Sequence, residues 1–175
     1  LGLKEINLPV VEVNARGKGK YMKLWKMYRA LSPESHDVVF VAYGDTRLMS
    51  VFAKLISRKP IVWDPLFSLY DNWVFDRKLT SPNGIKARYY WFLDWLGARF
   101  SDHIVLDTHT NAEYFSKEFG VPIEKFSRVL TGGDPTVFTP LAHNQDDSVF
   151  EVEFHGKYIP VHGVDVIIES AKLLE

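Results

Sequence analysis

The sequence predicts an α/β protein with a parallel, doubly wound sheet. Short apolar runs alternate with segments in which apolar residues recur at helical spacing, which is the pattern of βαβ units. The run at residues 37–43 is almost wholly apolar, which is typical of a parallel strand buried on both faces. Ligands bind such sheets at the carboxyl ends of the strands, so the residues after each strand are the first candidates for a site.

Strands and helices are expected to alternate along the whole chain. Strands are predicted at residues 8–13, 37–43, 60–63, 103–106 and 149–154. Helical stripes are predicted at residues 21–31, 48–55, 85–100, 110–120 and 164–174. Ser81-Pro82 is a favourable helix start, and Thr110 with Glu113 forms a capping box for a helix that Gly120 is suited to close.

The helix at residues 21–31 and its approach are strongly basic, with no acidic residue between Arg16 and Glu34. The basic residues are Arg16, Lys18, Lys20, Lys23, Lys26 and Arg29. One interpretation is a solvated face on a surface helix. The other is attachment to an anionic membrane surface, where each basic residue contributes about 1 kcal/mol.

The helix at residues 85–100 is rich in aromatic side chains. Its expected core stripe consists of Ile85, Tyr89, Phe92, Leu93, Leu96 and Phe100. Off this stripe, and near Arg88 and Arg99, lie Tyr90, Trp91 and Trp95. These three either enter a membrane interface or pack under a neighbouring loop, and we favour packing because large aromatics belong more often to the core.

The bulk composition is that of an ordinary globular protein. The 175 residues are 46% hydrophobic and carry a net charge of −1, which argues against nucleic-acid binding by bulk electrostatics. No cysteine is present, so disulfides and thiolate chemistry are excluded. No apolar run approaches the roughly 18 residues that cross a bilayer, and the six histidines lack zinc-ligand spacing. The expected compartment is the cytoplasm, without a bound metal.

Two groups of polar residues follow predicted strands and are therefore candidates for a ligand site. Gly44 and Asp45 end the strand at residues 37–43, and Asp64 and Asp71 bound the loop after the next strand. Turn or cap formation is the alternative role for each carboxylate, and it is the stronger one for Asp71.

A strand, a glycine, a basic residue and a helix occur in this order at residues 149–174. Gly156 is expected to let the backbone leave the strand at an angle closed to other residues. Lys157 and His162 flank the following loop. Such loops hold phosphate in α/β proteins because the unpaired N–H groups at a helix start attract an anion. Lys157 is otherwise a solvent-exposed loop lysine.

Together with residues 131–140, this unit resembles the middle of the family 4 glycosyltransferases, which have the GT-B fold. Their first domain ends in a pattern like N-G-V-D-x-x-x-F-x-P, which Gly132, Asp134, Phe138 and Pro140 match. Thr131 and Gly133 replace the asparagine and the valine. Their second domain opens with a strand, G-R or G-K, and K-G-x-x-x-L-I-x-A. This second pattern is matched by Gly156, Lys157, Gly163, Ile167 and Ala171. The segment at residues 101–106 and the helix after it also resemble the family.

The resemblance implies three parts of the chain. Residues 1–140 would form a Rossmann-like acceptor domain that lacks its first strand, and residues 141–148 would be the linker. Residues 149–175 would begin a nucleotide-sugar-binding domain that the chain does not complete. The 175 residues alone are therefore expected not to catalyse transfer.

The implied reaction moves a sugar from a nucleotide diphosphate sugar to an acceptor hydroxyl, with retention and without a required metal. Gly156, Lys157 and His162 would bind the donor diphosphate, and Lys157 would stabilise the charge on the leaving diphosphate. Asp64 would be catalytic, with Gly44, Asp45 and Asp71 on the acceptor side. Because many members use lipid-linked acceptors or polysaccharide precursors, the resemblance favours membrane contact through the basic helix. Its residues for that contact are Lys20, Lys23, Lys26 and Arg29.

Two departures from the family pattern keep alternatives open. Leu66 stands where a D-x-H pattern would place a histidine after Asp64, and His162 stands where lysine is usual. A membrane-attached binding module of the same fold without catalytic activity fits both departures. A GT-B nucleotide-sugar epimerase is the other alternative.

Overall fold

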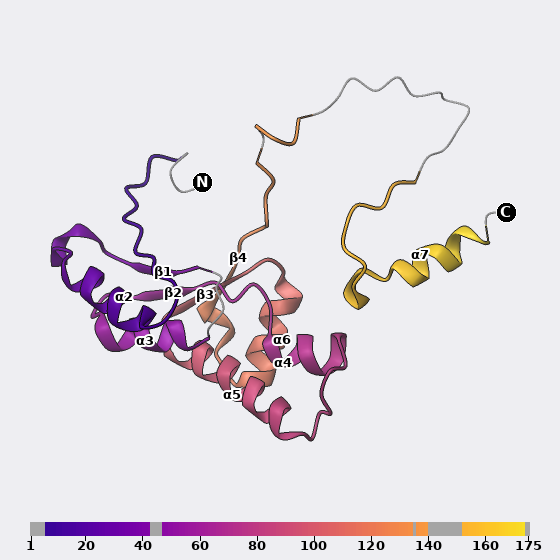
Figure 1. Ribbon diagram of the computed structural model, residues 1–175, viewed down its shortest axis with the longest axis horizontal. Coiled ribbons are helices and arrows are strands. Elements are labelled where there is room, and N and C mark those ends of the chain that lie inside the picture. Colours follow the sequence, from indigo (N-terminus) through magenta and orange to yellow (C-terminus); the bar gives the residue numbers. More distant parts are fainter. Residues whose placement is uncertain (1–5, 43–46, 135, 140–151, 174–175) are drawn as a thin grey trace.

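The computed structural model describes residues 6–42, 47–134, 136–139 and 152–173. Its centre is a four-stranded sheet in which every pair of neighbouring strands is parallel, in the order β1-β2-β3-β4 (Figure 1). The strands are β1 (Val39–Val41), β2 (Ile61–Trp63), β3 (His103–Leu106) and β4 (Phe126–Arg128). The predicted α/β class with a parallel sheet is therefore confirmed.

The helices between the strands lie on one side of this sheet, below the strands in Figure 1. They are α3 (Leu48–Ile56), α5 (Ile85–Phe100) and α6 (His109–Phe119). Each strand is added next to the preceding one, so every right-handed crossover places its helix on the same face. The strand order does not reverse within the described residues, and a doubly wound sheet stays a prediction.

The helix α2 (Lys20–Arg29) confirms the predicted basic helix and packs beside α3. The rings of Tyr21 and Phe52 meet edge to face with their centroids 5.0 Å apart. The hydroxyl of Tyr28 donates to the Ser57 hydroxyl at 2.6 Å, directly after α3. These contacts add α2 to the layer of helices on the covered face of the sheet.

The core lies between the sheet and this layer. The register places Val41, Trp63 and Ile104 in one row across three strands, and all three are buried. Trp63 extends to α5 at Gly97, where a Cβ atom would lie 2.4 Å from the indole. Gly97 therefore sets the distance between α5 and the sheet.

The predicted core stripe of α5 is wrong in its first half. Ile85, Tyr89 and Phe92 are exposed, whereas Trp91 and Trp95 pack against the core. The residues that face the sheet are mostly small: Ala87, Asp94, Gly97 and Ala98 are buried. Small residues occupy this face because they let α5 approach Trp63 closely. The prediction that Trp91 and Trp95 pack within the protein is confirmed.

Several predicted boundaries shift by a few residues. The helix α5 begins at Ile85 after Gly84, rather than at Ser81-Pro82. Thr108, not Thr110, caps α6, because its side chain accepts a hydrogen bond from the Asn111 N–H at 3.1 Å. Gly120 ends α6 in the left-handed conformation, as predicted, with φ 63°.

Two predicted strands do not form in the described residues. Residues 8–13 are in no strand, and Leu8, Val10 and Val11 are exposed. Residues 152–154 are likewise outside any strand, while 149–151 and the predicted linker 141–148 lie outside the described residues. A strand needs a neighbour for its backbone hydrogen bonds, and neither segment has one among the described residues.

Short elements and one further helix complete the described chain. They are η1 (Pro33–Ser35), α4 (Leu69–Asp71), the π-helical η2 (Asn72–Asp76), η3 (Ile123–Lys125), η4 (Pro160–His162) and α7 (Val164–Ala171). None of the helices in the described residues has the length and apolar character needed to cross a membrane.

Candidate functional site

The segment after β2 lies at the carboxyl edge of the sheet and contains two predicted site residues, Asp64, which was predicted to be catalytic, and Asp71, which was predicted on the acceptor side. Asp64 follows the last residue of β2, and its Oδ1 accepts a hydrogen bond from the Leu66 N–H at 3.0 Å. This contact forms an Asx turn, in which Leu66 adopts the left-handed conformation with φ 63°. Oδ1 of Asp64 therefore stabilises the turn.

A buried ion pair holds this loop from below. The Arg47 Nε donates to the Asp94 Oδ1 at 2.9 Å, and the two side chains are 4% and 0% exposed. Arg47 also donates to the backbone carbonyls of Pro65 and Phe67. The three contacts tie α3 and α5 to the first half of the loop.

The second oxygen of Asp94 fixes the other half of the same loop. It accepts hydrogen bonds from the Ser68 hydroxyl at 2.8 Å and from the Tyr70 N–H at 2.9 Å. Burial raises the pKa of Asp94, and the neighbouring Arg47 opposes that rise. A buried charge survives in a protein when its partners satisfy it in this way.

Arg47 and Asp94 were not predicted from the sequence, although the sequence contains a signal for each of them. Asp94 is the only acidic residue in α5, in a position surrounded by aromatic and aliphatic residues. Arg47 directly precedes the apolar helix α3. An acid in an apolar stripe and an arginine near another apolar segment predict a buried pair, but only the fold shows that they meet.

Asp71 lies at the far end of the loop, beside two further ionisable groups. Burial of its carboxyl, and then the charge of Asp76, raise the pKa of Asp71, although the residue as a whole remains exposed. Burial, followed by the charges of Asp71 and Glu118, raises the pKa of Tyr114 well above its usual range. The Tyr114 hydroxyl is buried and makes no hydrogen bond of regular geometry, although it lies near Ser68.

Gly44 and Asp45, the other predicted acceptor-side residues, lie outside the described residues. Asp64 and Asp71 therefore lie in one segment of the chain, which the Arg47–Asp94 pair anchors between them.

The predicted donor loop at residues 156–163 has a compact local structure. The His162 Nδ1 donates to the Lys157 backbone carbonyl at 2.7 Å, which closes the loop on itself. A Cβ atom at Gly156 would lie 2.8 Å from the Phe154 ring and 3.0 Å from the His162 Nδ1. Gly156 is thus needed for close approach rather than for an unusual angle, and Gly163 takes the left-handed conformation instead, with φ 59°.

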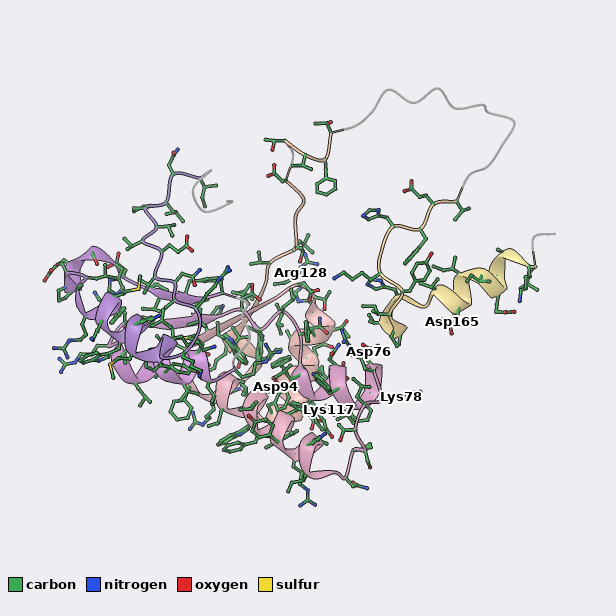
Figure 2. All side chains as sticks on the ribbon, in the orientation of Figure 1. Asp76, Lys78, Asp94, Lys117, Arg128 and Asp165 are labelled. Carbon is green, nitrogen blue, oxygen red and sulfur yellow. The ribbon has the colours of Figure 1, made fainter. Side chains whose placement is uncertain are left out.

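The loop leads directly into the N-terminus of α7. Lys157 is exposed, and its ammonium takes part in none of the ion pairs of the described residues. Asp165 occupies the first turn of α7 (Figure 2) and already places a negative charge at this helix start. The positive charge for an anionic ligand must therefore come from Lys157.

Among the described residues, no ion pair connects the segment at residues 64–71 with the predicted donor loop at residues 156–163. Those residues also contain no group of three or more side chains suited to hold a metal ion. What the chain offers is an anchored loop with two carboxylates and a glycine–lysine loop at a helix start. No family model, curated protein or solved structure matches this chain.

Proposed function

We propose that this chain takes part in sugar transfer from a nucleotide diphosphate sugar to an acceptor hydroxyl. The observation that carries the proposal is the loop from Gly156 to Gly163. Its glycine excludes a side chain, its lysine is outside the ion pairs of the described residues, and a helix follows it. A diphosphate suits such a loop because it can meet a fixed positive charge beside the N–H groups at the start of α7.

Lys157 would act on the leaving diphosphate. Negative charge grows on the diphosphate as the bond to the sugar breaks, so the ammonium binds the transition state better than the intact donor. His162 would have a different role from the one that its position suggested. Its Nδ1 donates to the Lys157 carbonyl, so its ring would shape the loop that presents Lys157.

Asp64 and Asp71 would receive the acceptor. Asp71 is the better candidate to accept a proton from an attacking hydroxyl, because a raised pKa brings a carboxylate closer to neutral pH. Asp64 would orient the acceptor through its second oxygen. The Arg47–Asp94 pair would keep both carboxylates in place without touching the substrate.

Replacing Lys157 tests the proposal in the natural gene product that contains this chain. Lys157→Ala is expected to lower kcat for sugar transfer by about 10²–10³ and to change the donor KM much less. Lys157→Arg should retain much of the activity, because it keeps the charge. Lys172→Ala, at the C-terminal end of α7 and paired with Glu169, is the matched control and should leave kcat unchanged.

An unchanged kcat for Lys157→Ala at saturating donor would mark Lys157 as an ordinary surface lysine. Equal losses in Lys157→Ala and Lys172→Ala would point to a general disturbance of α7. Either result would remove the donor-site assignment on which the proposed function depends.

A further inference from the structure

The helices α2, α3 and α5 carry many basic residues and no exposed acid. Their basic residues are Lys20, Lys23, Lys26, Arg29, Lys54, Lys86, Arg88 and Arg99. Their only acid is Asp94, which is fully buried against Arg47. Lys54 pairs with Asp102 at 2.6 Å, while the other seven take part in none of the ion pairs of the described residues.

Large apolar side chains are exposed on the same helices. Leu55 of α3 is 75% exposed, and Tyr89 of α5 is 56% exposed. Further exposed side chains are Met22 and Trp25 on α2, Leu48 on α3, and Ile85 and Phe92 on α5. An open groove of about 310 Å³ lies between α2 and α3, and its lining is Tyr21, Met22, Trp25 and Phe52.

The three helices form one continuous surface. The rings of Tyr21 and Phe52 join α2 to α3, and the Ser50 hydroxyl donates to the Gly97 carbonyl of α5 at 3.4 Å. Buried side chains of α3 and α5 face the sheet, so the exposed apolar residues lie on the outer side of the layer. Figure 1 shows α2, α3 and α5 beside one another on the same side of the strands.

We propose that this α2–α3–α5 surface docks onto an anionic lipid bilayer. Lysine and arginine side chains would reach the headgroup phosphates, while residues such as Met22, Trp25 and Leu55 enter the boundary with the acyl chains. A surface with seven cations outside the ion pairs of the described residues, exposed apolar groups and no exposed acid on its own helices matches that boundary in both charge and polarity. The inference does not depend on the proposed sugar transfer.

The charges also decide against the other occupants of an apolar surface. A second copy placed on the same surface by two-fold symmetry would bring two sets of seven cations together, and they would repel. The net charge of −1 argues against a nucleic acid. The neighbouring helix α6 carries Glu113 and Glu118, so the basic surface ends there and gives the bilayer contact one orientation.

Flotation of this chain with vesicles tests the proposal. Binding is expected with vesicles of phosphatidylglycerol and phosphatidylcholine in equal amounts, and not with phosphatidylcholine alone. A Lys20→Glu, Lys23→Glu, Lys26→Glu triple variant should bind at least about 100-fold more weakly. The control is the triple variant Lys78→Glu, Lys117→Glu, Lys172→Glu, which changes the net charge by the same amount at positions outside the α2–α3–α5 surface. It should bind nearly as well as the wild type.

Depth of insertion gives a second measurement. Brominated lipids should quench the wild-type tryptophan fluorescence more than that of Trp25→Phe, because Trp25 enters the boundary. A Tyr89→Ser, Phe92→Ser variant should lose binding while keeping its circular dichroism spectrum. Equal weakening of vesicle binding in the two lysine variants would overturn the proposal, and so would full binding by the Lys20→Glu, Lys23→Glu, Lys26→Glu variant. Dimers of the wild type that form without vesicles and are lost in the Tyr89→Ser, Phe92→Ser variant would also overturn it.

Discussion

At the scale of single residues, Arg47 and Asp94 hold the loop that carries the candidate carboxylates. The side-chain hydrogen bonds of this pair join the start of α3, α5 and residues 65–70, and the Arg47 guanidinium also lies over the ring of Trp63 in β2. Their removal should therefore affect both the core and the loop. Figure 2 places Asp94 within the helical layer, away from the exposed charges at its edge such as Lys78.

Asp94→Ala is expected to lower the free energy of unfolding by about 3–5 kcal/mol, because it leaves the Arg47 charge buried without a partner. Lys54→Ala is the matched control. It breaks the ion pair with Asp102, whose side chains are 39% and 42% exposed, and should cost about 1 kcal/mol or less. Urea denaturation followed by circular dichroism measures both, and similar losses would contradict the structural role of Asp94.

Asp71 provides a pH-dependent prediction. Its folded-state pKa is raised above 3.8, so the stability that its protonated form contributes is present below pH 3.8 and is lost as the pH rises through the folded pKa. Asp71→Asn should therefore stabilise the protein at pH 7, by about 0.5 kcal/mol or less, and should have no effect near pH 3.

Thermal unfolding of both proteins from pH 3 to pH 7 measures this difference. Asp134→Asn is the control, and it should destabilise the protein at pH 7 rather than stabilise it. Hydrogen bonds from Thr136 lower the pKa of Asp134, so the ionised carboxylate is the form that the fold favours. A stabilisation by Asp71→Asn that does not vary with pH would show that titration of this carboxyl is not the cause.

At the scale of elements, local sequence and tertiary packing decide different properties of a helix. The left-handed Gly120 and the threonine cap of α6 are local features, and they mark that helix within two residues. The orientation of α5 is not local. Its apolar residues occupy nearly the whole circumference, so periodicity alone does not say which of them face the sheet.

Two substitutions in α5 test this orientation. Tyr89→Ser should change the free energy of unfolding by about 0.5 kcal/mol or less, because the side chain is exposed. Trp91→Ala should cost about 3 kcal/mol, because the indole packs on Phe119 and donates to Glu118 at 2.8 Å. Guanidinium denaturation measures both, and the reverse order would show that the predicted stripe faces the core after all.

At the scale of the whole molecule, the described sheet is covered by helices on one face. Consecutive strand order places α3, α5 and α6 on that face, and strand residues alternate between it and the other face. Val41 faces the helices and is 7% exposed, whereas its neighbour Phe40 faces the other way and is 47% exposed. On that second face the His103 ring nitrogen and the Ser127 hydroxyl form a hydrogen bond of 2.8 Å between β3 and β4.

The two adjacent residues of β1 should therefore respond differently to the same substitution. Val41→Ser is expected to lower the free energy of unfolding by about 2–3 kcal/mol, and Phe40→Ser by about 1 kcal/mol or less. Both values come from urea denaturation of the purified chain. A larger loss for Phe40→Ser would mean that this face of the sheet is covered as well.

The fold class and most of the elements around the sheet could be predicted from the sequence. The apolar runs near residues 40, 62 and 104 became parallel strands, and α2, α3, α6 and α7 formed near their predicted positions. The residue types of the predicted donor loop were also visible, because glycine, lysine and a helix start act over a few positions. Such features depend on short-range geometry and periodicity, which the order of residues contains.

The contacts between distant residues became apparent in the folded structure. It paired Arg47 with Asp94 across 47 positions and placed Gly97 against Trp63. It also turned Tyr89 and Phe92 outward and left residues 8–13 without a strand partner among the described residues. These outcomes depend on which surfaces come into contact and how closely they pack, and a side chain's own type does not fix that.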